Sequence, residues 1–234
     1  MGTQLNPLSA CIGVLTQPSA TFFVLKKQHN WSWLAFLLVM VAAILPMYYY
    51  FHVVDFQWYK ESIIASQFSN VSPSEQQSAR GLLEATRGII GTVITPFIMM
   101  LTLVSIIAGY LNITTKIDPQ NINSYGDWFG FSWWVLMPSC VGALLSLGIL
   151  FFATDGQISF DAISPSALSF IFAIPPTSSW FGLASSIKLE TFWTMYLIFI
   201  GLSQWVELSR QRAIIIAFTP CLVIWLSWAL LLLF

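Results

Sequence analysis

The sequence predicts an all-α protein, a polytopic membrane bundle of five transmembrane helices preceded by short amphipathic helices. Of its 234 residues, 57% are hydrophobic and only 8% are charged, and the mean hydropathy is +0.76. A soluble domain carries about 25% charged residues, so this chain has too little charge to cover a surface that faces water. Its apolar residues also gather in runs of about 20, the length that crosses the hydrocarbon core of a bilayer.

Residues 1–30 are predicted to form a cytoplasmic segment that lies along the membrane surface. Apolar side chains recur there at helical spacing, at Leu8, Cys11, Ile12 and Leu15, and a second short apolar run, 22–25, follows Pro18. Short helices with one apolar face settle in the plane of the interface. Lys26 and Lys27 follow the apolar residues, whereas a signal peptide carries its basic residues first.

The transmembrane domain is predicted over residues 31–234, with spans at about 31–50, 88–111, 127–153, 189–206 and 213–234. The connection 207–212 is so short that the last two spans must form an antiparallel hairpin. The outer loop 51–87 is long enough for an amphipathic helix. In 159–187, prolines at 165, 175 and 176 interrupt short apolar runs, which favours an interfacial or re-entrant loop, with a sixth span as the alternative.

Basic residues near membrane ends predict the orientation. With the N-terminus inside, five Lys and Arg residues lie inside and four outside, and the pairs Lys26–Lys27 and Arg210–Arg212 adjoin spans. Short loops rich in Lys and Arg stay in the cytoplasm. The N-terminus is therefore expected in the cytoplasm and the C-terminus outside.

Composition and motifs argue against an enzyme. No nucleophile, phosphate-binding or metal motif occurs, and no ionisable residue falls near the middle of a predicted span. No metal or cofactor is expected. The net charge of −1 gives no basic surface for nucleic acid. An enzyme would require the interfacial charges to gather in one centre, and these are Asp127, Glu207, Arg210 and Arg212.

Each of these charges also has a structural interpretation. Asp127 suits a helix N-cap, and Glu207 with Arg210 forms an i, i+3 pair at a helix end. Lys188 and Glu190 are expected at the outer mouth of the fourth span.

Prolines within or near the spans mark candidate helix breaks, with hydroxyl side chains beside them. Besides Pro46, the residues concerned are Thr92, Thr95, Pro96, Pro138, Ser139, Thr219 and Pro220. A proline frees a backbone carbonyl, which in a bilayer must find another donor. These breaks are either ordinary bends or the walls of a cavity, as in transporters.

The third span also carries a small-residue face and an aromatic run. Gly142 and Ser146 form a small-xxx-small pair, which allows close packing inside the bundle or self-association. The aromatic residues of 128–134 are expected to anchor the helix at the membrane interface.

Several sequence features together resemble a bacterial member of the Yip1 family. They are Asn6-Pro7 before an amphipathic segment, Pro18 and a basic pair, then Leu136-Met137-Pro138-Ser139, and a hairpin from Gly201-Leu202-Ser203 to Arg210-Gln211-Arg212-Ala213. The usual glycine pair and basic residue before the central span are replaced by Asn121, Asn123 and Gly126. The resemblance implies five spans, a cytoplasmic N-terminus and the bacterial inner membrane. Eukaryotic relatives contact Rab GTPases through a longer N-terminal segment, so Rab binding is not expected here.

Two functions follow from these observations. The first is a non-enzymatic membrane protein that acts through membrane lipids, self-association or another membrane protein. The alternative is a channel or carrier for a neutral or amphipathic solute, whose cavity would lie between the second, third and fifth spans and contain Thr92, Thr95, Ser139 and Thr219.

Overall fold

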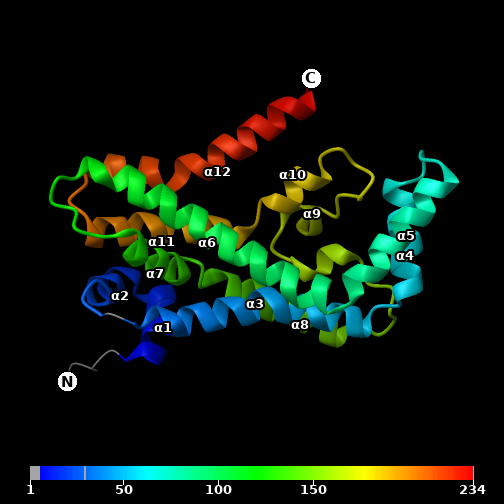
Figure 1. Ribbon diagram of the computed structural model, residues 1–234, viewed down its shortest axis with the longest axis horizontal. Coiled ribbons are helices and arrows are strands. Elements are labelled where there is room, and N and C mark those ends of the chain that lie inside the picture. Colours follow the sequence, from blue (N-terminus) through cyan, green and yellow to red (C-terminus); the bar gives the residue numbers. More distant parts are fainter. Residues whose placement is uncertain (1–5, 29, 234) are drawn as a thin grey trace.

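The computed structural model describes residues 6–28 and 30–233, so residues 1–5 and 29 of the predicted N-terminal segment and residue 234 of the last span lie outside the described residues. The chain forms an elongated bundle of helices (Figure 1). Helices α1 (Pro7–Thr16) and α2 (Pro18–Leu25) lie at one end, and α4 (Phe56–Gln67) and α5 (Pro73–Arg87) lie at the other.

Four helical stretches are long and apolar enough to cross a membrane. They are α3 (Ser32–Val53), the stretch Ile90–Ile117, the stretch Tyr125–Phe152 and α12 (Arg210–Leu233). Their bounds lie close to four of the predicted spans. The other predicted span forms α11 (Leu189–Trp205), whose 17 residues extend about 26 Å. Because this falls short of the roughly 30 Å of hydrocarbon, the length of α11 does not confirm a count of five.

Two of these stretches are interrupted where the prolines predict it. Ile90–Ile117 begins with a π-helical turn, η1 (Ile90–Ile94), continues as α6 (Thr95–Thr114) with Pro96 in its first turn, and ends in η2 (Thr115–Ile117). The stretch Tyr125–Phe152 consists of α7 (Tyr125–Val135) and α8 (Pro138–Phe152), which are separated at residues 136–137. By contrast, α12 continues through Pro220.

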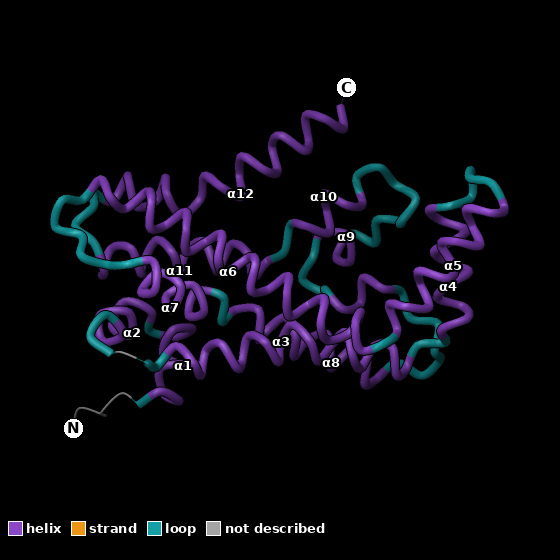
Figure 2. Tube along the Cα trace, in the orientation of Figure 1, coloured by secondary structure: helices purple, strands orange, loops and turns teal. Residues whose placement is uncertain are grey.

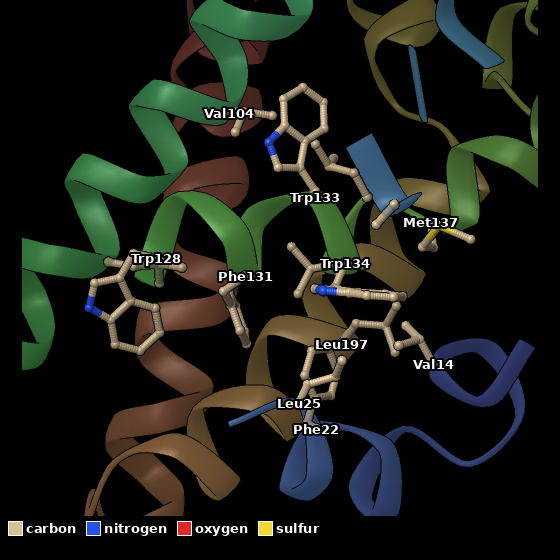
Figure 3. Packing of buried hydrophobic residues seen from close by; sticks show 14 of the residues in the cluster. Val14, Phe22, Leu25, Val104, Trp128, Phe131, Trp133, Trp134, Met137 and Leu197 are labelled. Atoms are coloured by element: carbon tan, nitrogen blue, oxygen red, sulfur yellow. The ribbon is translucent and has the colours of Figure 1, made fainter. Parts of the chain in front are cut away.

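The main core lies around α7, where α1, α2, α3, α6 and α11 meet it (Figure 3). Trp128 and Phe131 are completely buried, and Trp133 and Trp134 are 2% exposed. The expectation that the aromatic run 128–134 anchors the bundle at the membrane interface is therefore wrong for these four residues. Their position on a helix surrounded by other helices encloses them in protein.

Helices α4 and α5 form a hairpin in the predicted outer loop. Asp55 accepts hydrogen bonds from the first turn of α4, and Ser72 begins α5 with a capping box. Lys60 pairs with Glu84, and Arg80 pairs with Glu61 at 3.0 Å. The hydrogen bond from Arg80 holds the pKa of Glu61 below its usual range.

The segment after α8 contains only short helices: η3 (Phe160–Ile163), α9 (Leu168–Ile171) and α10 (Phe181–Ser186). Loops join them, as Figure 2 shows. No helix in 159–187 exceeds six residues. The alternative prediction, a sixth spanning helix in this segment, is therefore wrong. The segment instead packs back onto the bundle, where Ala162 O accepts a hydrogen bond from Ser146 Oγ at 3.2 Å and Ile158 O accepts one from Tyr50 Oη at 2.8 Å.

Candidate functional site

A half-open groove of about 510 Å³ lies among α3, η1, α6, α8 and the start of α11. We call it the central groove. Its lining residues are Ala42, Ala43, Pro46, Met47, Gly91, Thr95, Pro96, Met99, Met100, Leu103, Ser139, Gly142, Ala143, Ile163, Ser164, Lys188 and Glu190.

The π-helical turn before Pro96 forms part of the groove wall. Thr95 donates to the carbonyl oxygen of Ile90 from its backbone N–H and, at 2.9 Å, from its Oγ1. The Ile90 carbonyl thus accepts two hydrogen bonds from Thr95, one from its backbone and one from its side chain.

Small residues of α8 allow a charged side chain to enter the bundle. A Cβ atom on Gly142 would come within 2.8 Å of Glu190 Oε1, so the glycine leaves the space that this carboxylate occupies. Ser146, one turn further on, is fully buried and bonds to the loop at Ala162. On the small-residue face, Gly142 therefore meets the first turn of the neighbouring helix α11, and Ser146 meets the segment 159–187.

The polar wall of the groove is built around an isolated antiparallel bridge between Ala167 and Lys188, which joins the turn 164–167 to the start of α11. Backbone hydrogen bonds from Leu168 N to Ile187 O at 3.0 Å and from Leu189 N to Ser166 O at 3.2 Å hold the segments together. This pairing places two serines beside two charged residues.

Each serine contacts one of the charged side chains. Lys188 Nζ donates to Ser164 Oγ at 3.0 Å, and Ser166 Oγ donates to the Glu190 carboxylate. Among the described residues, the ion pairs are confined to the α4–α5 hairpin, so Lys188 and Glu190 are not paired with each other.

Lys188 and Glu190 lie deeper in the bundle than the sequence predicts. Gly142, which Glu190 contacts, is ten residues before the end of α8 at Phe152, or about 15 Å along the helix. The expectation that these two charges sit at the outer mouth of a span is therefore corrected. The reason is that α11 is short and begins inside the bundle, where the segment 159–187 has carried the chain.

Ser139 presents a polar group without a partner. Its Oγ is buried and makes no hydrogen bond to any described residue, and the residue lines the central groove. A buried hydroxyl without a partner costs about 1–3 kcal/mol. Such an atom is typical of a position that binds water or ligand.

The other two hydroxyl residues predicted for the cavity, Thr92 and Thr219, do not line this groove. Thr92 lines a separate space of about 120 Å³ with Tyr48, Phe51, His52 and Arg87, and its own hydroxyl donates to Gly88 O at 3.0 Å. Thr219 is exposed on α12 next to Pro220. The predicted cavity among the second, third and fifth spans is thus replaced by a groove in which α3 and the start of α11 take the place of α12.

The interfacial charges occupy helix ends. Asp127 lies in the first turn of α7 and completes a capping box in which Ser124 is the N-cap. Glu207, Arg210 and Arg212 are exposed, and the backbone N–H of Glu207 donates to Asp118 Oδ2 at 2.8 Å. No ion pair joins any two of these four charged residues in the described part of the chain.

Sequence reasoning overlooked the role of Ser164, Ser166, Lys188 and Glu190. A signal for it exists in the sequence, because the fourth predicted span is short, starts with charged residues and follows a proline- and serine-rich segment. If such a segment dips into the bilayer, the helix after it begins below the surface.

Comparison with known proteins supports the family resemblance. The Yip1 domain matches residues 12–231, which is nearly the whole chain. No curated protein and no solved structure matches it. Together with its long apolar helices, the match shows that this chain is a membrane protein of the Yip1 domain family.

Proposed function

We propose that this protein is a non-enzymatic membrane protein that binds lipid, and that the central groove holds the polar end of a lipid molecule. The observation that carries the proposal is the amphipathic lining of one groove: Ser139, Lys188 and Glu190 share it with apolar residues of α3 and α6. Its volume of about 510 Å³ falls within the range of about 300–1,000 Å³ that is usual for ligand pockets.

The groove also has an opening that suits a lipid. Met99 and Leu103 line it, yet they are 66% and 44% exposed. They therefore mark an edge where the groove meets the surroundings of α6, which in a membrane is hydrocarbon. A headgroup could enter sideways while its acyl chains remain along α6.

The charges support a ligand at this depth. An ionisable side chain near the middle of a bilayer costs about 2.5–3.5 kcal/mol on insertion scales, and such groups are generally functional. The hydrogen bonds that Lys188 donates to Ser164 and that Glu190 accepts from Ser166 offset part of this cost but leave the two charges without an opposite charge.

The proposal places five spans in a bacterial inner membrane, with the N-terminus inside and the C-terminus outside. Helices α1 and α2 and the connection between α11 and α12 lie at one end of the bundle (Figure 1), so Lys26, Lys27, Arg210 and Arg212 gather there, as expected of a cytoplasmic side. The segment 159–187 then lies within the outer leaflet and makes up the length that α11 lacks. Reporter fusions at both termini test this orientation.

The lipid-binding proposal is tested by filling the groove. Ala43→Phe adds an aromatic ring at a lining position, and Leu145→Phe adds the same ring at a residue of α8 that is 54% exposed and outside the groove. Native mass spectrometry of protein extracted in a mild detergent should show retained phospholipid on the parent chain and on Leu145→Phe, but much less on Ala43→Phe. Equal retention in all three would refute lipid binding in the groove. The same spectra report whether copies self-associate.

A carrier of amphipathic molecules is the second candidate, because the groove lies between two stretches that prolines interrupt, at Pro96 and Pro138. A carrier would move labelled lipid between the leaflets of a reconstituted vesicle, and Ala43→Phe would slow this movement. Retained lipid without any such movement favours lipid binding alone.

A further inference from the structure

We infer that the central groove selects a zwitterionic phospholipid whose headgroup carries a primary ammonium, of the phosphoethanolamine type. This inference rests on the proposed function and adds the chemical class of the headgroup. Lys188 would contact the phosphate and Glu190 would contact the ammonium.

The charges in the groove favour a headgroup that carries both signs. The groove contains one cationic and one anionic side chain, and neither belongs to an ion pair among the described residues. An anionic headgroup would satisfy Lys188 but face the Glu190 carboxylate without a counter-charge. A cationic amphiphile would meet the opposite problem, so a headgroup with both charges complements this wall.

Both charged groups are held in place. Ser164 accepts from Lys188 Nζ at 3.0 Å, and Ser166 donates to the Glu190 carboxylate. The two serines lie in one turn, residues 164–167, which a hydrogen bond from Ala167 N to Ser164 O at 2.9 Å closes. The Ala167–Lys188 bridge joins this turn to the start of α11, so the backbone places both serines beside the two charged side chains.

The lining of the groove favours a primary ammonium over a quaternary one. Proteins recognise quaternary ammonium groups with cages of aromatic rings, and none of the described residues that line the groove is aromatic. A primary ammonium instead has three N–H donors, which suit a carboxylate acceptor. The buried Ser139 hydroxyl, which has no partner among the described residues, offers a further hydrogen bond to the headgroup.

The experiment is a competition among three phospholipids with identical acyl chains, which carry phosphoethanolamine, phosphoglycerol and phosphocholine headgroups. Native mass spectrometry of the full chain counts each bound lipid. A photoactivatable version of each lipid, followed by peptide mapping, reports whether the lipid contacts the groove. The parent chain should retain the phosphoethanolamine lipid about tenfold better than either competitor, as expected for one charged hydrogen bond.

Two nearly isosteric variants test the assigned contacts. Glu190→Gln should abolish the preference over the other two headgroups while groove labelling persists, because the new amide oxygen can still accept from Ser166. Lys188→Gln should weaken retention of all three lipids, since each carries a phosphate. Glu61→Gln and Lys116→Gln remove the same charges at exposed positions and should leave the preference unchanged.

The outcomes distinguish the two proposals. Groove labelling with no headgroup preference, or with a preference that Glu190→Gln leaves intact, would overturn the inference and leave lipid binding in place. Absence of groove labelling, together with equal lipid retention by Ala43→Phe, would overturn the proposed function itself.

Discussion

Replacing Gly201 with alanine should destabilise the bundle, although alanine is the better helix former. A Cβ atom on Gly201 would lie 2.3 Å from Phe131 Cε2 and 2.4 Å from its Cζ. The Phe131 ring is completely buried and is in contact with Phe22, Trp128 and Trp205, at centroid distances of 5.2, 5.4 and 4.9 Å. The ring therefore has no free direction in which to move.

The sign of the effect follows from two opposing magnitudes. Alanine gains about 0.8–1.0 kcal/mol over glycine in a helix, whereas overpacking a closed core costs about 1–3 kcal/mol. At this site the overpacking lies in the upper part of its range, because the ring is enclosed by three aromatic neighbours. We therefore expect a net loss of about 1–2 kcal/mol.

Thermal unfolding of the detergent-solubilised protein, followed by tryptophan fluorescence, measures this loss. The matched control is Gly109→Ala on α6, where an added Cβ atom meets nothing within 4 Å, so this variant should be as stable as the parent or more stable. An unfolding temperature for Gly201→Ala equal to that of Gly109→Ala would refute the packing argument.

Three further predictions concern the groove and the α11–α12 connection. Gly142→Ala should displace the Glu190 carboxylate, which lies 2.8 Å from the new Cβ position. Lipid retention in native mass spectrometry should therefore fall, although no charge is removed. Unchanged retention would contradict the placement of the Glu190 carboxylate beside Gly142. Ser139→Ala removes a buried hydroxyl without a partner among the described residues. The unfolding temperature of this variant should match or exceed that of the parent, while its lipid retention falls. A clear loss of stability would show that the hydroxyl is needed for packing. Asp118→Ala should lower the unfolding temperature, because it removes the acceptor of the Glu207 N–H at 2.8 Å. The expected loss of unfolding free energy is about 1–3 kcal/mol. A stability equal to that of the parent would exclude a role for this bond.

The long helices could be predicted from the sequence because the physics of a spanning segment is local. A run of about 20 apolar residues needs no knowledge of its neighbours to be recognised, and the bounds of α3 and α12 lie close to the expected ones. The interruptions at Pro96 and Pro138 were predicted because proline removes a backbone hydrogen bond. However, α3 and α12 continue through Pro46 and Pro220, so a proline alone does not decide where a helix is interrupted.

The predictions that the structure contradicts concern features that depend on contacts between distant parts of the chain. Tryptophan is typical of the membrane interface, which is why Trp128 and Trp133 were expected there. They are buried only because other helices pack around α7. The depth of Glu190 likewise depends on how the segment 159–187 returns to the bundle. No local pattern shows that Gly142 faces a charged residue of the neighbouring helix rather than an apolar one.

The most direct test of the lipid-binding account is a structure of the protein in nanodiscs that contain phosphoethanolamine lipid. If the groove binds lipid, a lipid headgroup will lie in the central groove, within hydrogen-bond distance of Lys188, Glu190 or Ser139, with its acyl chains leaving past Met99 and Leu103. A groove that contains only water, or one closed by its own side chains with lipids confined to the outer faces of the bundle, would contradict it.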